Sequence, residues 1–233
     1  MRKILFYLTV LLFTMYSSVL HASVYANISL DLSSRYVFRG MMPAGPRPAA
    51  TVNAALYFSS YDIHVSQWYV NSIGDLSAFH ESGTMLSYYH YFNDRFVASG
   101  GLTAYIYPGR SDDNFGLEFT LSFSDLKCRI PYYIETHYDP VLGSLYGKIS
   151  GGYNADWFLP FHFAMGTGVN LLTYTRFGKT VPAGFSDISI DAATFLSLNN
   201  WQLTPKLSYI IPLKTAIHDK TVLQAGVSIA YAF

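Results

Sequence analysis

A histidine and a serine lie two residues apart in the segment His80-Glu81-Ser82-Gly83. Side chains at positions i and i+2 of a β-strand point to the same face, so the imidazole and the hydroxyl would stand side by side. A base beside a hydroxyl can generate an activated nucleophile, which makes this pair a candidate for ester hydrolysis. The competing interpretation is a polar loop end that enters a strand. Replacing Ser82 with Ala would separate the two, because only a hydrolase would lose activity.

The His80-x-Ser82 pair resembles the His-x-Ser element of outer-membrane phospholipase A and of lipid A deacylases. The resemblance implies an active site on the outside of a β-barrel. The sequence departs from those families at Gly83, where they carry Asn. A third catalytic group, expected about one hairpin later, would fall near Asp94, in a turn at the wrong end of the barrel. These departures favour a protein that is not an enzyme.

The other residues that could ligate a metal have unsuitable spacing. The seven histidines contain no pair with the HExxH spacing of zinc enzymes, and Cys128 is the only cysteine. A single cysteine also excludes a disulfide framework. Asp112-Asp113-Asn114 lacks the regular ligand spacing of a calcium loop and is interpreted as a solvated turn. We therefore expect neither a metal nor a cofactor.

The composition indicates a protein whose surface faces lipid. Aromatic residues make up 17% of the 233 residues, and charged residues only 13%, about half of the usual share. Basic and acidic residues both number fifteen, so there is no basic excess that would bind nucleic acid. A mean hydropathy of +0.20 is too apolar for a disordered chain.

The N-terminus has the features of an export signal. Two of its first three residues are basic, and residues 4–16 are apolar. This stretch is shorter than the roughly 20 residues of a spanning helix, so we expect cleavage, after Ala22 or after Ala26. Residues 1–26 are thus predicted to be a signal peptide and residues 27–233 the mature domain. Since no later apolar run would form a spanning helix, a closed β-barrel is the predicted way to cross a membrane.

Apolar and polar residues alternate with the period of a β-strand in several segments. Over 115–124 the odd residues are Phe or Leu, and the even residues are Gly, Glu, Thr or Ser. Residues 223–233 alternate in the same way, and so do residues 28–39, where Tyr36 and Phe38 fall on the apolar face. This period favours strands that have one face toward lipid and the other toward a lumen.

Turn signals divide the sequence into strands. The short signals lie at 60–62, 93–95, 124–126, 154–156 and 199–200, and longer Pro/Gly/Asp-rich connections lie near 41–48, 71–80, 108–113, 139–143, 175–185 and 212–220. Their strict alternation predicts an all-β, antiparallel transmembrane barrel of twelve strands, with ten as the alternative count, short periplasmic turns and longer outer loops. The stretch 63–92 fits least well. The apolar residues Ile63 and Val65 are at odd positions, whereas Trp68 and Val70 are at even positions. This change of face within one strand predicts a β-bulge.

Parity assigns most charged side chains to the interior of the barrel, where water surrounds them at little cost. The predicted pore-lining residues are Asp31, Arg35, Arg39, Glu118, Lys127, Arg129, Glu135, Lys148, Asp191 and Lys206, with Asp187 on the same face. Opposed charges would create a transverse field across a narrow water-filled pore, whereas paired charges would plug the barrel. Twelve strands lie between the filled eight-stranded barrels and the open sixteen-stranded channels, so both arrangements stay open. The near balance of signs argues against strong ion selectivity.

Two short motifs resemble those of the TorF-type porin family. The segment 34–40, Ser-Arg-Tyr-Val-Phe-Arg-Gly, resembles its opening motif, in which an aromatic residue and then Arg-Gly close the first strand. The segment 105–109 resembles its later Tyr-x-Tyr-Pro-Gly motif, and Glu118 stands where an acidic residue follows. Segment 76–92 departs from the family pattern. The resemblance implies an outer-membrane channel of undefined substrate, with Arg39 and Glu118 in its lumen.

The sequence as a whole predicts a porin-like channel in the outer membrane of a Gram-negative-type cell, for passive passage of small hydrophilic solutes. Its expected partners are outer-membrane lipids, those solutes and, through the terminal Phe233, the outer-membrane assembly machinery. The alternatives are a lipid hydrolase that uses His80 and Ser82, and a plugged structural or adhesive barrel. The predicted loops reach only about ten residues, which is short for an adhesin.

Overall fold

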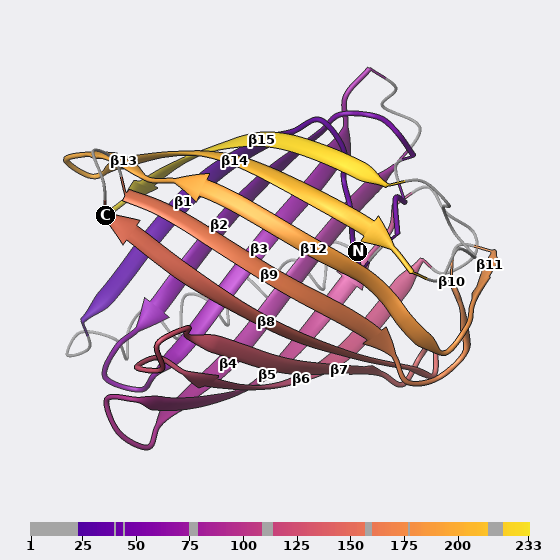
Figure 1. Ribbon diagram of the computed structural model, residues 1–233, viewed down its shortest axis with the longest axis horizontal. Helices are drawn as coiled ribbons and strands as arrows, with labels where there is room; N and C mark the ends of the chain where they lie inside the picture. Colours follow the sequence, from indigo (N-terminus) through magenta and orange to yellow (C-terminus); the bar gives the residue numbers. More distant parts are fainter. Residues whose placement is uncertain are drawn as a thin grey trace, which may run out of the picture.

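The computed structural model describes residues 23–39, 41–43, 45–74, 79–108, 114–156, 160–176, 178–213 and 221–233, so most of the predicted signal peptide lies outside the described residues. Antiparallel strands form a closed barrel (Figure 1). Its twelve wall strands are β1 (Val24–Ser33), β2 (Ala49–Phe58), β3 (Ile63–Ser72), β4 (His80–Tyr91), β5 (Phe96–Ile106), β6 (Phe115–Asp125), β7 (Tyr132–Asp139), β8 (Ser144–Asp156), β9 (Pro160–Asn170), β12 (Gly184–Thr194), β14 (Trp201–Pro212) and β15 (Val222–Ala232). The predicted fold class and strand number are thus confirmed.

The barrel closes where the first and last strands pair. β1 and β15 run antiparallel from Asn27 opposite Ala232 to Ser33 opposite Gly226. Three short strands complete the set: β13 (Leu196–Leu198) pairs with the start of β14, and β10 (Tyr174–Arg176) and β11 (Lys179–Val181) pair only with each other. Within the described part of the chain, no helix is both long and apolar enough to cross a membrane.

Connections at the two ends of the barrel alternate, as the sequence predicts, but their lengths do not all follow the prediction. The β7–β8 connection comprises only residues 140–143, whereas the β6–β7 turn comprises residues 126–131. The short turns, such as 59–62 and 92–95, lie at the end of the barrel that also holds both ends of the described chain (Figure 1). We call this end the short-turn rim. The opposite end, the loop rim, carries the longer connections 34–48 and 171–183. In outer-membrane barrels the short-turn rim faces the periplasm.

The two faces of the wall differ in chemistry. On β6, the outward side chain of Leu121 is 67% exposed, whereas the inward side chain of Glu118 is 1% exposed. Met165 on β9 is 62% exposed on the outer face. An apolar outer face and a polar inner face are what a bilayer and a wet lumen require, because hydrocarbon cannot hydrogen bond to polar side chains.

β1 ends at Ser33, six residues before the end of the predicted first strand. The prediction that Tyr36 and Phe38 face lipid is therefore wrong. The Tyr36 hydroxyl donates a hydrogen bond to Glu81 at 3.1 Å, and the Phe38 ring packs against the Tyr105 ring at 6.2 Å between centroids. Both partners are inward-facing side chains of the wall, so the chain at Tyr36 and Phe38 folds into the lumen.

The predicted bulge in the stretch 63–92 is also wrong. β3 and β4 pair in continuous register from Ile63 opposite Tyr88 to Asn71 opposite His80. Trp68 and Val70 face inward, where Val70 is 1% exposed and packs in an apolar cluster with the Trp68 ring. The change of parity therefore marks apolar residues that are buried inside the lumen. The wall has its register shift on β12, in the segment 185–187.

Candidate functional site: the lumen constriction

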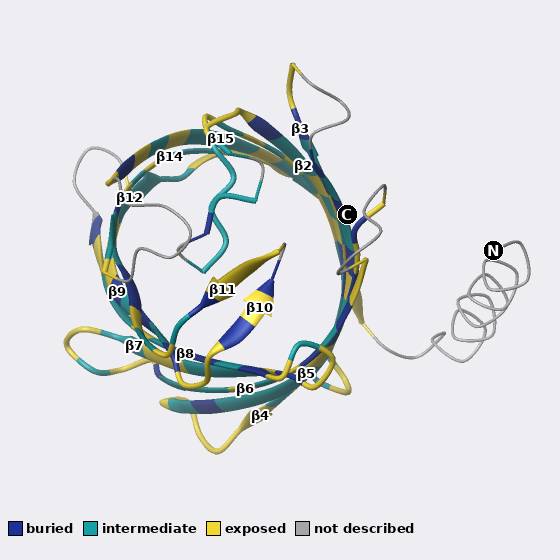
Figure 2. Ribbon diagram, turned by 90° about the vertical axis from the view of Figure 1, so that its right-hand side faces the viewer, coloured by how far each residue is buried: buried dark blue, intermediate teal, exposed yellow. Residues whose placement is uncertain are grey.

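Two segments from the loop rim meet inside the barrel. Figure 2 shows the β10–β11 hairpin within the ring of wall strands. Its residues Tyr174 and Val181 form a buried apolar cluster with Met41, against which Phe38 packs. The 34–48 loop and the β10–β11 hairpin therefore support each other, and together they narrow the lumen at the loop rim. We call this region the constriction.

A tight turn at the tip of the 34–48 loop presents Arg39 to the wall. The backbone N–H groups of Phe38 and Met41 each donate to the carbonyl of the other at 2.8 Å, which closes the turn. Arg39 has a φ of +48°, a left-handed conformation that non-glycine residues adopt uncommonly. The contacts of the guanidinium offset this backbone cost.

Arg39 forms an ion pair with Glu118 of β6. Its guanidinium carbon also lies 4.7 Å from the centre of the Phe38 ring and 4.9 Å from that of Tyr146 on β8. The two charged side chains are only 7% and 2% exposed. Burial disfavours the charged guanidinium, but the Glu118 carboxylate raises the pKa of Arg39 above its ordinary value, so the arginine stays charged.

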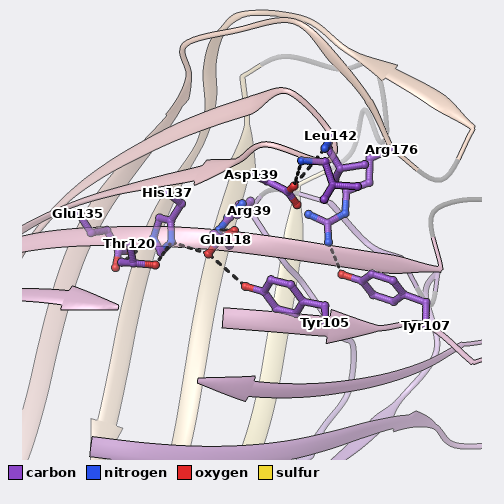
Figure 3. Close-up of polar contacts among 11 residues, drawn as sticks. Arg39, Tyr105, Tyr107, Glu118, Thr120, Glu135, His137, Asp139, Leu142 and Arg176 are labelled. Atoms are coloured by element: carbon purple, nitrogen blue, oxygen red, sulfur yellow. Dashed lines mark hydrogen bonds and ion pairs between the residues drawn. The ribbon is translucent and has the colours of Figure 1, made fainter. Parts of the chain in front are cut away.

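Glu118 is the centre of a hydrogen-bonded network on the wall (Figure 3). The Tyr105 hydroxyl donates to its Oε1 atom at 3.1 Å, and His137 Nδ1 lies 2.8 Å from the same oxygen. His137 Nε2 lies 3.3 Å from a carboxylate oxygen of Glu135, which is opposite Lys148 in the register of β7 and β8. Charged and polar groups thus run without a break from the constriction along the inner wall.

A second buried carboxylate, Glu81 on β4, holds the same loop. Its Oε1 atom accepts hydrogen bonds from the Tyr36 hydroxyl at 3.1 Å and from Trp68 Nε1 at 2.8 Å. Glu81 is 2% exposed. The loop is therefore attached to the wall at two independent carboxylates, one through Tyr36 and one through Arg39.

Arg176 anchors the β10–β11 hairpin. It donates a hydrogen bond to the Tyr107 hydroxyl (Figure 3), and its guanidinium carbon lies 5.0 Å from the centre of the Phe38 ring and 5.5 Å from that of Tyr107. The residue is 1% exposed. A charged side chain of the hairpin thus packs against aromatic rings of the loop and of the end of β5, which joins the three segments in the constriction.

The opposite side of the lumen is more open. Lys206 on β14 and Asp31 on β1 form an ion pair at 2.9 Å across β15, and their side chains are 38% and 25% exposed. Both point inward, because Asp31 shares the face of Ser29 and Ser33 and Lys206 that of Ser208. The inner wall beside β15 is therefore partly accessible to water, whereas Glu81, Glu118 and Arg176 in the constriction are buried.

The structure places the predicted pore-lining residues in different settings. Arg39 and Glu118 meet in the constriction, and the inner face of the wall carries Asp31, Glu135, Lys148, Asp187, Asp191 and Lys206. Arg35 lies just beyond β1, where its carbonyl accepts a hydrogen bond from Gln224 at 2.8 Å. Lys127 and Arg129 do not line the wall, because β7 begins only at Tyr132 and both lie in the exposed 126–131 turn, where Lys127 forms an ion pair with Asp94.

Several residues of the constriction were not predicted from the sequence. Glu81, Tyr107, His137 and Arg176 all contribute polar contacts there. Thr84, Leu86 and Tyr88 alternate on the outer face of β4. Extending this alternation back to Ser82 and His80 would have placed Glu81 on the inner face. No pattern within the short β10 segment indicates that Arg176 enters the lumen.

His80 and Ser82 lie on the outer face of the barrel, since Glu81 between them points inward. His80 Nδ1 lies 3.0 Å from the Tyr69 hydroxyl, so the imidazole has a partner on β3. Asp94, the position expected for a third catalytic group, lies in the 92–95 turn at the short-turn rim, far along the strand from Ser82. The geometry brings together the histidine and a tyrosine, and not the groups of a hydrolase.

The fold is shared with outer-membrane channels of known structure. The chain is similar to KdgM porin, with a TM-score of 0.61 at 9% identity over 89% of this chain and 99% of that chain. It is similar to NanC porin, with a TM-score of 0.59 at 8% identity over 88% and 98%. LpxR from Salmonella typhimurium aligns with a TM-score of 0.53 at 8% identity over 88% and 99%. No protein-family model and no curated protein sequence matches the chain. The common property is the closed antiparallel barrel.

Proposed function

We propose that the chain is a porin-like outer-membrane channel through which small hydrophilic solutes pass passively. The observation that carries this proposal is the accessible ion pair of Asp31 and Lys206 on the inner wall, beside the packed constriction. A plugged barrel would bury its interior charges, whereas a wet passage leaves part of the lumen wall in contact with water. The shared fold with KdgM and NanC porins supports the same function.

The passage would run along β1, β14, β15 and β12, on the side that the constriction leaves open. Asp31, Asp191 and Lys206 line this side with both signs of charge. Such a wall favours small polar solutes without strong preference for anions or cations. The constriction would set the upper size limit, because its packed rings reduce the cross-section at the loop rim.

The test is ion selectivity in planar bilayers, measured as the reversal potential in a salt gradient. Lys206→Gln removes a positive charge and leaves Asp31 without its partner, so the channel should become more cation-selective. Asp31→Asn should shift the reversal potential in the opposite direction. The control is Ile190→Ala, because Ile190 lies on the outer face and is 48% exposed. Unchanged reversal potentials in both charge variants would contradict a passage along this wall.

A TorF-type porin assignment is part of this proposal. Segments 34–40 and 105–109, which resemble that family, supply the constriction residues Arg39, Tyr105 and Tyr107. The terminal Phe233 is 70% exposed at the short-turn rim and meets the Tyr231 ring edge to face at 4.7 Å between centroids, which suits recognition by the assembly machinery. A hydrolase is the less favoured function, and Ser82→Ala should leave conductance unchanged.

A further inference from the structure

The outer face of β3 and β4 carries a row of polar side chains that a channel does not need. Three successive outward-facing pairs of the two strands form this row, which we call the polar stripe: Asn71 with His80, Tyr69 with Ser82, and Gln67 with Thr84. Gln67, Tyr69 and Thr84 are exposed, and the other three are half-buried. The stripe thus runs from the loop rim toward the middle of the wall.

The polar stripe differs from the rest of the outer surface. On the other ten wall strands, the described outward side chains include no amide, no imidazole and no charged group, apart from Asp125 at the end of β6. Gln67 lies five residues before the end of β3. At about 3.3 Å per residue and a strand tilt of about 40°, it is roughly 13 Å below the loop-rim end of the strand. That depth is inside an apolar band about 25 Å tall. A polar group there is unfavourable unless a partner hydrogen bonds to it.

The surroundings of the stripe would allow a close approach. Ala54 on β2 is opposite Gln67, and Ala104 on β5 is opposite Thr84, so small residues flank the stripe on both sides. A hollow of about 290 Å³ on the outer face is lined in part by Ala54, Val65 and Gln67. Farther along β4, Leu86 and Tyr88 protrude and are 49% and 51% exposed. A hollow and a ridge thus lie side by side on the same surface.

We propose that the polar stripe is the surface through which a second copy of this chain binds, side by side in the membrane. Amide and hydroxyl groups both donate and accept hydrogen bonds, so the stripe can pair with an identical stripe across a two-fold axis. The ridge at Tyr88 would face the hollow at Gln67 of the other copy. Small and polar residues are the ones that mediate association within membranes. The inference depends on the barrel spanning a membrane and not on its being a channel.

A lipid is the less suitable occupant on chemical grounds. Acyl chains cannot hydrogen bond to Gln67 or Thr84. The phosphates of a lipid headgroup are bound mainly by Lys and Arg side chains, and the stripe has neither. Two identical surfaces therefore satisfy the polar groups better than lipid does.

Disulfide trapping in intact membranes tests the proposal. In a Cys128→Ser background, Thr84→Cys places a thiol on the polar stripe. Ile190→Cys is the matched control, because Ile190 is also on the outer face but on β12. Oxidation with copper phenanthroline should convert most of the Thr84→Cys protein to a covalent dimer and leave the Ile190→Cys protein monomeric. Equal yields from the two variants would overturn the proposal.

A second measurement does not depend on trapping. The purified protein in detergent micelles should have twice the mass of one chain by light scattering. The dissociation constant of the dimer should be at least tenfold higher in the double variant Gln67→Leu/Thr84→Val. Heat-modifiable migration on gels verifies that the variant folds. A wild-type protein that stays monomeric at all concentrations would contradict the proposal. Co-purifying lipopolysaccharide that is lost from the double variant would assign the stripe to lipid and overturn the proposal as well.

Discussion

Replacing Glu118 with Gln should loosen the 34–48 loop from the barrel wall. The amide has the shape of the carboxylate, and its oxygen can still accept hydrogen bonds from Tyr105 and His137. The change removes the negative charge opposite Arg39 and turns the amide NH₂ group toward the guanidinium. Because the Arg39 side chain is only 7% exposed, its charge would stay buried without a counter-charge.

The size of the effect on loop opening follows from the burial of the Arg39–Glu118 ion pair. Removing one partner of a buried ion pair destabilises a protein by about 3–5 kcal/mol. A factor of ten in an equilibrium constant corresponds to about 1.4 kcal/mol, so local opening of the loop should become more frequent by roughly 100- to 4,000-fold. The barrel itself should remain folded, because its wall is closed by strand pairing that does not involve Arg39. Tyr36 still anchors the loop to Glu81.

Thiol labelling measures this opening directly. Met41 is 2% exposed in the constriction, so Met41→Cys in a Cys128→Ser background should react with a water-soluble maleimide only when the loop opens. Adding Glu118→Gln should raise the labelling rate by the factor given above. The control is Glu135→Gln, because Glu135 contacts His137 but not Arg39; we expect a rise of less than about tenfold. A labelling rate within twofold of the parent in the Glu118→Gln variant would refute the account of the constriction.

Two further predictions concern packing and processing. Gly83 faces the Trp68 indole so closely that an added methyl group would overlap the ring. Gly83→Ala should therefore lower the free energy of unfolding by about 1–3 kcal/mol in urea titrations of the protein in lipid vesicles. Gly100→Ala, whose methyl group would meet only Leu121 at 3.7 Å, should change it by less than about 0.5 kcal/mol, and equal effects would contradict this packing. Cleavage after Ala22 would leave β1 whole, whereas cleavage after Ala26 would remove three residues that pair with β2. Mass spectrometry should find Ser23 at the mature N-terminus, and a protein that begins at Asn27 would contradict this.

The alternation of residue types predicted the wall well because the bilayer and the lumen impose it on every strand. The pattern over 115–124 and 223–233 matches the inward and outward faces of β6 and β15, and the turn signals gave the strand number. The alternation could not be extended safely into the turns, however. The parity rule carried through the 126–131 turn assigned Lys127 to the lumen, where it does not lie.

The constriction was less predictable because its contacts join segments that are far apart in sequence. Tyr36 and Phe38 continue the alternation of β1, and nothing in that alternation distinguishes a strand from a loop that folds inward. Trp68 and Val70 broke the pattern because the inserted loop buries them, and a bulge would give the same parity change. The location of Arg39 and Glu118 in the lumen, by contrast, was predicted from the sequence. Both the strand alternation and the resemblance to the porin family placed the two residues there, although not their contact with each other.

Single-channel conductance of the refolded protein in a planar bilayer tests the central claim most directly. A water-filled passage beside the constriction predicts discrete conductance steps, with a reversal potential that moves in opposite directions in Lys206→Gln and Asp31→Asn. A protein that is correctly folded by heat-modifiable migration, yet silent in the bilayer, would contradict the channel and indicate that the packed constriction closes the barrel.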